Sequence, residues 1–185
     1  MKREKVTLPF TWFFLKIRPV LRWLIKLRSS PKAIAGGFAL GLFIAFTPTI
    51  GAQIIISVIL ATSLNVNRTA SVLAVWLTNP ATIPAIFTFN YWVGSHIFPG
   101  PSVSEVSRTI LNLASRVTKL DVWEIKGQLL AVSELGFDII IPLFIGSILN
   151  GIVCAGLSYI VLLRLLEGFF ERRERKRKSK TKMNT

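Results

Sequence analysis

Long uncharged, mainly apolar runs alternate with charged segments along the chain, and this pattern predicts helices in a membrane. Residues 33–64 contain no charged side chain, and residues 69–98 contain none apart from a possible charge on His96. Residues 136–166 form a third apolar run, long enough to cross a hydrocarbon core about 30 Å thick. We therefore expect 136–166 to be a transmembrane helix and 33–98 to be a membrane region.

The first two runs are interrupted near their centres. The first is broken at Thr47-Pro48-Thr49-Ile50-Gly51 and the second at Asn79-Pro80, with Pro84 following. Proline removes a backbone donor and glycine weakens a helix, so both sites predict helix breaks. Each segment is either one broken, tilted span or a re-entrant pair of half-helices, and the pattern leaves open which segment takes which form.

The remaining segments are amphipathic or basic. Residues 1–32 predict a basic interfacial helix, or a helix packed on the protein's own spans. Residues 99–135 predict an amphipathic linker: Ser102 and Glu105 fit a capping box, and Asp121 and Glu124 suggest a second helix start. One face of the linker's first helix is apolar at Val103, Val106, Ile110, Leu113, Val117 and Leu120. Residues 167–185 are dense in charge, which predicts a disordered basic tail.

Composition and charge support the membrane assignment. Hydrophobic residues make up 51% and charged residues 17% of the chain, whereas soluble domains average about 25% charged residues. The net charge of +14 comes mainly from the two ends of the chain. Basic ends around an apolar middle predict two cytoplasmic termini beside anionic headgroups, and nucleic acid is not expected as a partner. Cys154 is the only cysteine, so no disulfide within the chain is expected.

Residues that carry catalytic chemistry are sparse. His96 is the only histidine, and no phosphate loop, nucleophile motif or metal-ligand spacing is present in the sequence. We therefore expect no enzyme activity, no cofactor and no metal. The uncharged polar and helix-breaking residues of the two breaks are the candidates to line a substrate path, or else they only cap the broken helices: Thr47, Pro48, Thr49, Gly51, Gln53, Thr78, Asn79, Pro80 and Thr82.

Four charged residues have possible roles at the membrane. Arg68 is either a topology anchor or a contact to a headgroup or substrate phosphate, and Arg172 and Arg173 are candidates to bind headgroups. Asp138 is either a proton site within the membrane or a water-exposed carboxylate.

An ordered set of short motifs resembles one bacterial membrane protein family, the domain of unknown function 2062. The resemblance covers about residues 28–164 and implies a bacterial inner-membrane protein, but it implies no activity. The motifs are Ser30-Pro31, Gly37-Phe-Ala-Leu-Gly41, Pro48-x-x-Gly51-x-Gln53, Asn67-Arg68 and Trp76-x-x-Asn79-Pro80-x-Thr82-x-Pro84, followed by Tyr91, Gly94, Pro142, Gly146-Ser147 and Tyr159.

These features predict an all-α, polytopic helical membrane protein with one long spanning helix and two Pro/Gly-broken hydrophobic hairpins, for which the re-entrant form is one of the two alternatives. The first functional hypothesis is a small inner-membrane transporter, channel or lipid-translocating protein, whose path is lined by the two breaks. A chain of this size encloses little by itself, so we expect a homo-oligomer. The second hypothesis is a non-transporting scaffold or accessory subunit that binds a partner or anionic lipid.

Overall fold

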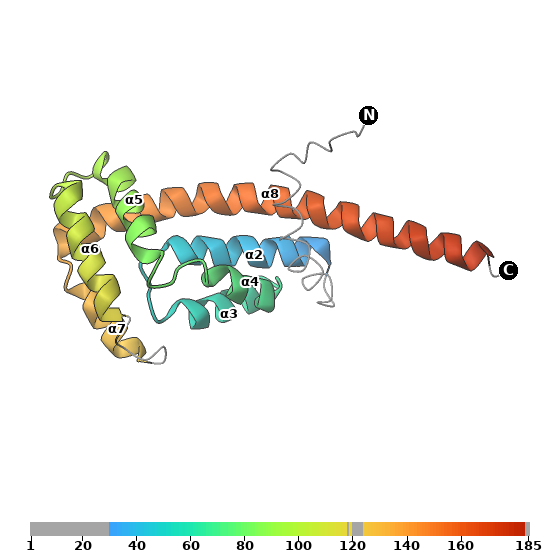
Figure 1. Cartoon of the computed structure of the whole chain (residues 1–185), viewed down its shortest axis with the longest axis horizontal. Helices are drawn as coiled ribbons and strands as arrows, with labels where there is room; N and C mark the ends of the chain where they lie inside the picture. The colour runs from blue at the N-terminus through green and yellow to red at the C-terminus, as the bar shows by residue number, and fades with distance from the viewer. Residues whose placement is uncertain (1–29, 118, 120–123, 184–185) are drawn as a thin grey trace, which may run out of the picture.

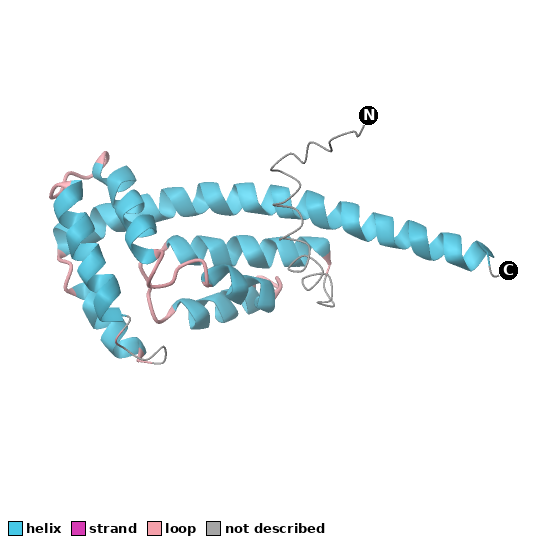
Figure 2. Ribbon diagram, in the orientation of Figure 1, coloured by secondary structure: helices cyan, strands magenta, loops and turns pink. Residues whose placement is uncertain are grey.

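The computed structural model describes residues 30–117, 119 and 124–183, and these residues form helices and no strand (Figures 1 and 2). The all-α prediction is therefore confirmed for the described residues. The interfacial helix expected within 1–32 lies almost entirely outside them. In chain order the helices are α2 (Pro31–Phe46), α3 (Gln53–Ser63), α4 (Arg68–Val75), α5 (Ile83–Ser95), α6 (Val103–Val117), α7 (Ile125–Ser133) and α8 (Phe137–Met183).

Helix α8 is the longest element, and α2 and α5 pack against it (Figure 1). Near the start of α2, Ile34 packs in one cluster with Leu166 of α8, whereas Phe43 near the end of α2 lies against Gly151. The two helices therefore run antiparallel. Among the described helices, only α8 has a stretch both long and apolar enough to cross a membrane, the 35 residues Phe137–Glu171.

The two expected breaks are confirmed as interruptions between helices. The first break (47–52) separates α2 from α3, and the second break (76–82) separates α4 from α5. Helix α3 turns back after the first break, because its far end leads through a short turn to Asn67, whose backbone N–H donates to the carbonyl of Ala33 at 2.9 Å. Helices α2 and α3 thus form a hairpin.

Helix α4 lies parallel to α2 at very short range. A Cβ atom added at Gly37 would lie 2.2 Å from the carbonyl oxygen of Asn67, and one at Gly41 would lie 2.0 Å from that of Ser71. The two glycines are four residues apart and lie on one face of α2, as the small-xxx-small pattern requires. The side chain of Asn67 accepts a hydrogen bond from Ala70 N at 2.8 Å, which caps the start of α4.

Helix α5 crosses α8 in the same close manner. A Cβ atom at Gly94 would lie 1.8 Å from the carbonyl oxygen of Pro142, and one at Gly146 would lie 1.8 Å from that of Asn90. Only glycine allows the two backbones to approach so closely. This crossing fixes the depth along α8 at which α5, and hence the second break, is held.

The linker contains two helices, α6 and α7, which lie at the end of the molecule where α8 begins (Figure 1). The apolar face of α6 is buried with Phe87 and Tyr91 of α5 and Leu143 of α8. Ser102 accepts a hydrogen bond from Glu105 N at 3.4 Å, in agreement with the first half of the capping box. Of the predicted apolar face, the structure buries Val106, Ile110, Leu113 and Val117.

The disorder expected for residues 167–185 is wrong for the backbone as far as Met183. Helix α8 continues without interruption to that residue, and its last turns extend beyond the other helices (Figure 1). Arg, Lys and Glu favour a helix when they are spaced along it, and a preceding long apolar helix removes the cost of nucleation. The charge density that suggested disorder is therefore compatible with a helix here.

Candidate functional site

The first break is closed by its own side chains. The Thr47 hydroxyl lies 2.7 Å from the carbonyl oxygen of Ile44, to which it donates, and 2.9 Å from the hydroxyl of Thr49. Gln53 Nε2 donates to the carbonyl of Thr47 at 3.3 Å. Gly51 has a φ of +84°, a left-handed conformation that glycine adopts without strain. The predicted polar residues of this break thus bind backbone carbonyls in the last turn of α2 and just after its end.

The second break is closed in a similar way. Asn79 Oδ1 accepts hydrogen bonds from the backbone N–H groups of Ala81 and Thr82, at 3.0 and 3.2 Å. The Thr82 hydroxyl donates to the carbonyl of Leu77 at 2.6 Å. This is the Asx-type geometry by which asparagine closes a turn before a helix. Asn79 and Thr82 therefore hold the chain between α4 and α5.

The structure brings the two breaks together. The Thr78 hydroxyl from the second break donates to the carbonyl of Ala45, the next-to-last residue of α2. Asn90 of α5 donates from Nδ2 to the carbonyl of Phe46 at 2.9 Å and to the hydroxyl of Ser147 at 3.0 Å. Asn150 Nδ2 in turn donates to Asn90 Oδ1 at 2.8 Å. The end of α2 is thus capped by side chains from its own break, the second break and α5.

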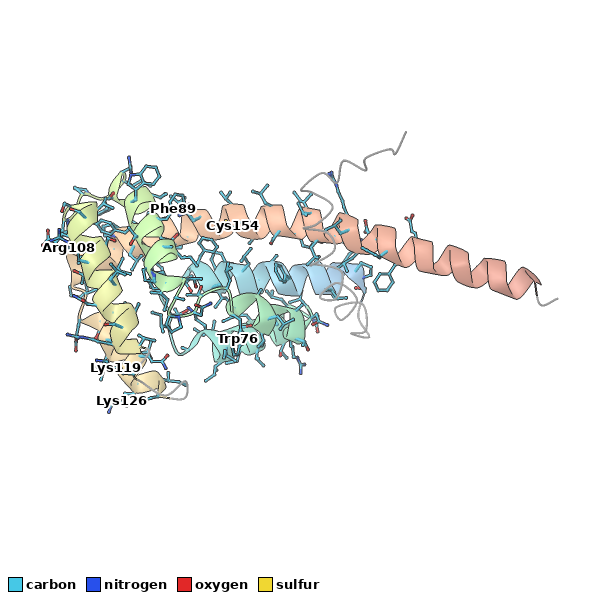
Figure 3. All side chains as sticks on the ribbon, in the orientation of Figure 1. Trp76, Phe89, Arg108, Lys119, Lys126 and Cys154 are labelled. Atoms are coloured by element: carbon cyan, nitrogen blue, oxygen red, sulfur yellow. The ribbon has the colours of Figure 1, made fainter. Side chains whose placement is uncertain are left out.

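A cavity of about 300 Å³ lies where the breaks meet. This volume is at the lower end of the range for small-molecule sites, about 300–1,000 Å³. Trp76, at the end of α4, lies at its edge and is 66% exposed (Figure 3). The cavity is lined by Ile50, Gly51, Gln53, Ile54, Val75, Trp76, Thr78, Asn79, Pro80, Ile83, Val117 and Gln128.

The cavity includes only part of the predicted substrate path. Gly51, Gln53, Thr78, Asn79 and Pro80 line it. The others, Thr47, Pro48, Thr49 and Thr82, belong to the same two breaks but are absent from its lining. Thr47 and Thr49 are hydrogen-bonded to each other and Thr47 also binds the end of α2, Pro48 is buried, and the Thr82 hydroxyl closes the second break.

The charged candidates lie elsewhere. Arg68 is exposed at the first position of α4, and Asp138 is exposed in the first turn of α8. Arg172 and Arg173 belong to α8, but their side chains lie outside the described residues. The basic residues Arg108 of α6, Lys119 of the connection and Lys126 of α7 are exposed and do not line the cavity (Figure 3).

Sequence reasoning missed two parts of the site. The linker supplies Val117 and Gln128 to the cavity wall, and Gln128 is buried against Gly51, whose added Cβ would lie 2.8 Å from Gln128 Oε1. Asn90 was also missed, although an amide within an otherwise apolar run is a recognisable signal of a buried polar contact. For Gln128 the sequence carries no comparable signal, because polar residues are common in an amphipathic linker.

The described residues contain no group of three or more His, Cys, Asp or Glu side chains placed to hold a metal ion. Polar atoms of the site are used by the protein itself. Among the described residues, Thr88 Oγ1 is the one buried side-chain nitrogen or oxygen atom without a hydrogen-bond partner, and Thr88 does not line the cavity. The site is therefore a mainly apolar cavity without charged side chains in its lining.

Comparison with known proteins agrees with the motif pattern. No curated protein and no solved structure matches the chain. A family model described as an uncharacterized protein conserved in bacteria matches residues 15–175. The match includes all of the cavity's lining residues and both breaks. The chain therefore belongs to this bacterial family, the domain of unknown function 2062.

Proposed function

We propose that the chain is a multi-pass protein of the bacterial inner membrane with both termini in the cytoplasm. The exposed side chains of α8 support a membrane location, since Ile152, Val153 and Leu157 are each more than half exposed. A core helix of a soluble protein would bury such residues. The basic ends of the chain support the orientation.

The course of the chain supports a particular topology. Helices α2 and α3 form a hairpin, which suits a re-entrant pair that begins and ends on the cytoplasmic side. Helices α4 and α5 then cross as one broken span, and α8 returns as the second crossing. Two crossings keep both ends on one side of the membrane, in agreement with the charge distribution.

The junction of the two breaks lies near the middle of the membrane in this arrangement. Ser147, which binds Asn90 at the junction, lies nine residues after Asp138. At about 1.5 Å per residue this is about 14 Å along α8, and half of a hydrocarbon core is about 15 Å. Broken helices that meet near the midplane are a common location of the substrate site in transporters.

The function that this geometry supports best is translocation of a lipid across the inner membrane. The observation that carries the proposal is the cavity that both breaks help to line, with no formally charged residue in its lining. A transporter or channel for an ion or a hydrophilic solute fits this lining less well, because such a substrate needs polar groups that are free to bind it. A homo-oligomer remains part of the proposal, since two crossings enclose little volume.

Filling the cavity tests this proposal. The chain is reconstituted in liposomes with a fluorescent phospholipid, and a membrane-impermeant reductant then quenches the label in the outer leaflet. We expect the wild type to raise the fraction of label that is quenched, because lipid from the inner leaflet reaches the outer one. Ile54→Trp, which fills the cavity, should slow this exchange.

Ile59→Trp is the matched control, because Ile59 lies on α3 as well but is 57% exposed and does not line the cavity. Equal exchange with and without the protein would overturn the proposal. Equal exchange by the wild type and Ile54→Trp would remove the cavity from the path.

A scaffold without transport is the second candidate. Its support is the bonding within the breaks, where the side chains of Thr47, Thr78 and Asn90 bind carbonyls at the end of α2. In hydrocarbon an unpaired backbone group costs several kcal/mol, so these contacts are explained by stability alone. Arg68, Arg172 and Arg173 would then anchor the scaffold to anionic headgroups.

Thiol labelling in intact membranes separates the two candidates. With Cys154 replaced by Ser, single cysteines are placed at Thr49 and Ala81, and at Val58 as an exposed position on α3 away from the breaks. A small, membrane-impermeant reagent that labels Thr49 and Ala81 but not Val58 would reveal water at both breaks and favour translocation. If all three sites react only after denaturation and lipid exchange is absent, the scaffold is favoured.

A further inference from the structure

The cavity wall is chemically uniform. Its largest group of residues is apolar and comes from four helices and the two breaks: Ile50, Ile54, Val75, Trp76, Ile83 and Val117. Three amides, one hydroxyl, one glycine and one proline complete the lining, and no residue in it is acidic or basic. A substrate that carries a charge would find no opposite charge there.

The polar groups of the wall are engaged in holding the fold. The Thr78 hydroxyl donates to Ala45 O, Gln53 Nε2 donates to Thr47 O, and Asn79 Oδ1 accepts from two backbone N–H groups. Gln128 also has an interaction partner. A headgroup taken into the cavity would lose its hydration without gaining equivalent hydrogen bonds, which is unfavourable.

Exposed residues close in sequence to the lining are apolar as well. Trp76 lines the cavity and is 66% exposed, and Leu73 and Leu77 near it in the chain are 39% and 43% exposed. Ile55, next to the lining residue Ile54, is 48% exposed. In the proposed topology these side chains face acyl chains of the bilayer, and Trp76 belongs both to the cavity wall and to this lipid-facing set.

We infer that the cavity binds an acyl chain of a bilayer phospholipid, which enters sideways from the membrane past Trp76 while the headgroup stays outside. This inference rests on the membrane location given under the proposed function. An acyl chain passes from the bilayer into an equally apolar cavity at little cost, whereas a headgroup would be desolvated. Binding should therefore depend on the chain and be nearly independent of the headgroup.

Photo-crosslinking of the full chain in lipid nanodiscs tests this inference. One phosphatidylcholine carries a diazirine in the middle of an acyl chain, and a second carries it on the headgroup. After illumination, adducts are located by peptide mass spectrometry. We expect the acyl-chain probe, and not the headgroup probe, to modify the segments 50–54 and 75–80 that line the cavity.

Variants show whether these adducts arise inside the cavity. Ile54→Trp fills it and should reduce adducts at 75–80 by about tenfold, which corresponds to about 1.4 kcal/mol of binding free energy. Ile59→Trp, on the exposed side of the same helix, should leave them unchanged. Ile54→Phe, a smaller change, gives an intermediate reduction if Ile54→Trp does not fold.

The inference is overturned if the headgroup probe modifies the lining segments, or if Ile54→Trp and Ile59→Trp give equal yields of adduct at 75–80. It is also overturned if acyl-chain adducts are no more frequent at 75–80 than at the exposed residues Val153 and Leu157 of α8. The lipid-exchange assay is read separately. Crosslinking in the cavity without lipid exchange supports the acyl-chain site and overturns translocation. Lipid exchange without crosslinking in the cavity supports translocation and overturns the acyl-chain site.

Discussion

The side-chain amide of Asn90 lies 2.9 Å from the carbonyl oxygen of Phe46, which it binds across 44 positions of the chain. Phe46 is the last residue of α2, and the carbonyls at a helix end have no partner within the helix. Asn90 itself has no exposed surface and also contacts Ser147 and Asn150 of α8. One amide therefore connects α2, α5 and α8 at the junction of the two breaks.

Replacing Asn90 with alanine should destabilise the fold mainly through the hydrogen bonds that are lost, and only in smaller part through the lost side-chain volume. Asn90→Ala leaves the Phe46 carbonyl and the Ser147 hydroxyl without this donor, and we expect the free energy of unfolding to fall by about 1–3 kcal/mol. Unfolding of the purified chain in mixed micelles, followed by circular dichroism, measures the change. Ser95→Ala is the control, because the half-buried Ser95 donates its hydroxyl to the carbonyl of Trp92 within its own helix. Equal stability of the two variants would contradict a connecting role for Asn90.

The α5–α8 crossing should tolerate no side chain at Gly146. A methyl group there would lie 1.8 Å from the carbonyl oxygen of Asn90, so Gly146→Ala must separate the helices at a cost of about 1–3 kcal/mol. Gly156→Ala on the same helix is the matched control, because no atom lies within 4 Å of its added Cβ. Alanine is the better helix former, so this control should be neutral or stabilising by up to about 1 kcal/mol. Thermal unfolding of both variants in the same detergent gives the comparison.

Alanine substitutions at Gly51 and Gly136 distinguish the cost of backbone strain from the cost of steric contact. Both have a left-handed φ, +84° and +81°, so alanine should cost about 1 kcal/mol or more at either position. At Gly51 the added Cβ would also lie 2.8 Å from Gln128 Oε1, whereas at Gly136 nothing lies within 4 Å. We therefore expect Gly51→Ala to be the more destabilising of the two in an equilibrium unfolding experiment.

The double variant Gly51→Ala with Gln128→Ala completes this comparison. Removing the Gln128 side chain should recover the steric part of the cost and leave the backbone part. If the loss in free energy of unfolding of the double variant equals the sum of the losses of the two single variants, the contact between Gly51 and Gln128 does not cause the extra cost of Gly51→Ala.

The basic end of α8 should bind anionic lipid. Deleting residues 172–182 removes most of the positive charge of the C-terminal end, and each basic residue near an anionic surface contributes about 1 kcal/mol. Full-length and shortened chains in neutral nanodiscs are mixed with anionic liposomes and centrifuged. We expect less of the shortened chain to sediment with the liposomes, and neither chain to sediment with neutral ones. Equal sedimentation would remove the tail as a headgroup-binding element.

Local features of the fold were predictable because they depend on residues close in sequence. Pro48, Gly51 and Pro80 lie in short segments where helix breakers are grouped with polar residues, and such segments interrupt helices. The period of Val106, Ile110, Leu113 and Val117 defines a buried face of α6. The continuation of α8 to Met183 was not predictable in the same way, since composition alone does not register that a long helix already precedes the basic segment.

The long-range part of the site was beyond such reasoning. The similarity of the two breaks in sequence contains no information that they meet, and the meeting depends on Gly37 and Gly41 admitting α4 and on Gly94 and Gly146 admitting α5. Small residues indicate that some close approach is possible, but they do not identify the partner helix. Gln128 lines the cavity because α6 and α7 pack next to the junction of the two breaks. The residues around Gln128 in the sequence do not predict this packing.

The capping of α2 by Thr78 and Asn90 has a consequence for biosynthesis. While the ribosome has delivered only α2 and α3, the carbonyls of Ala45 and Phe46 lack the donors that bind them in the finished protein. In the lipid interior such unpaired groups cost several kcal/mol each. In the proposed topology the nascent hairpin would therefore stay near the membrane surface or in the insertion machinery until residue 90 has emerged, which would make insertion of this half of the protein a late and concerted step.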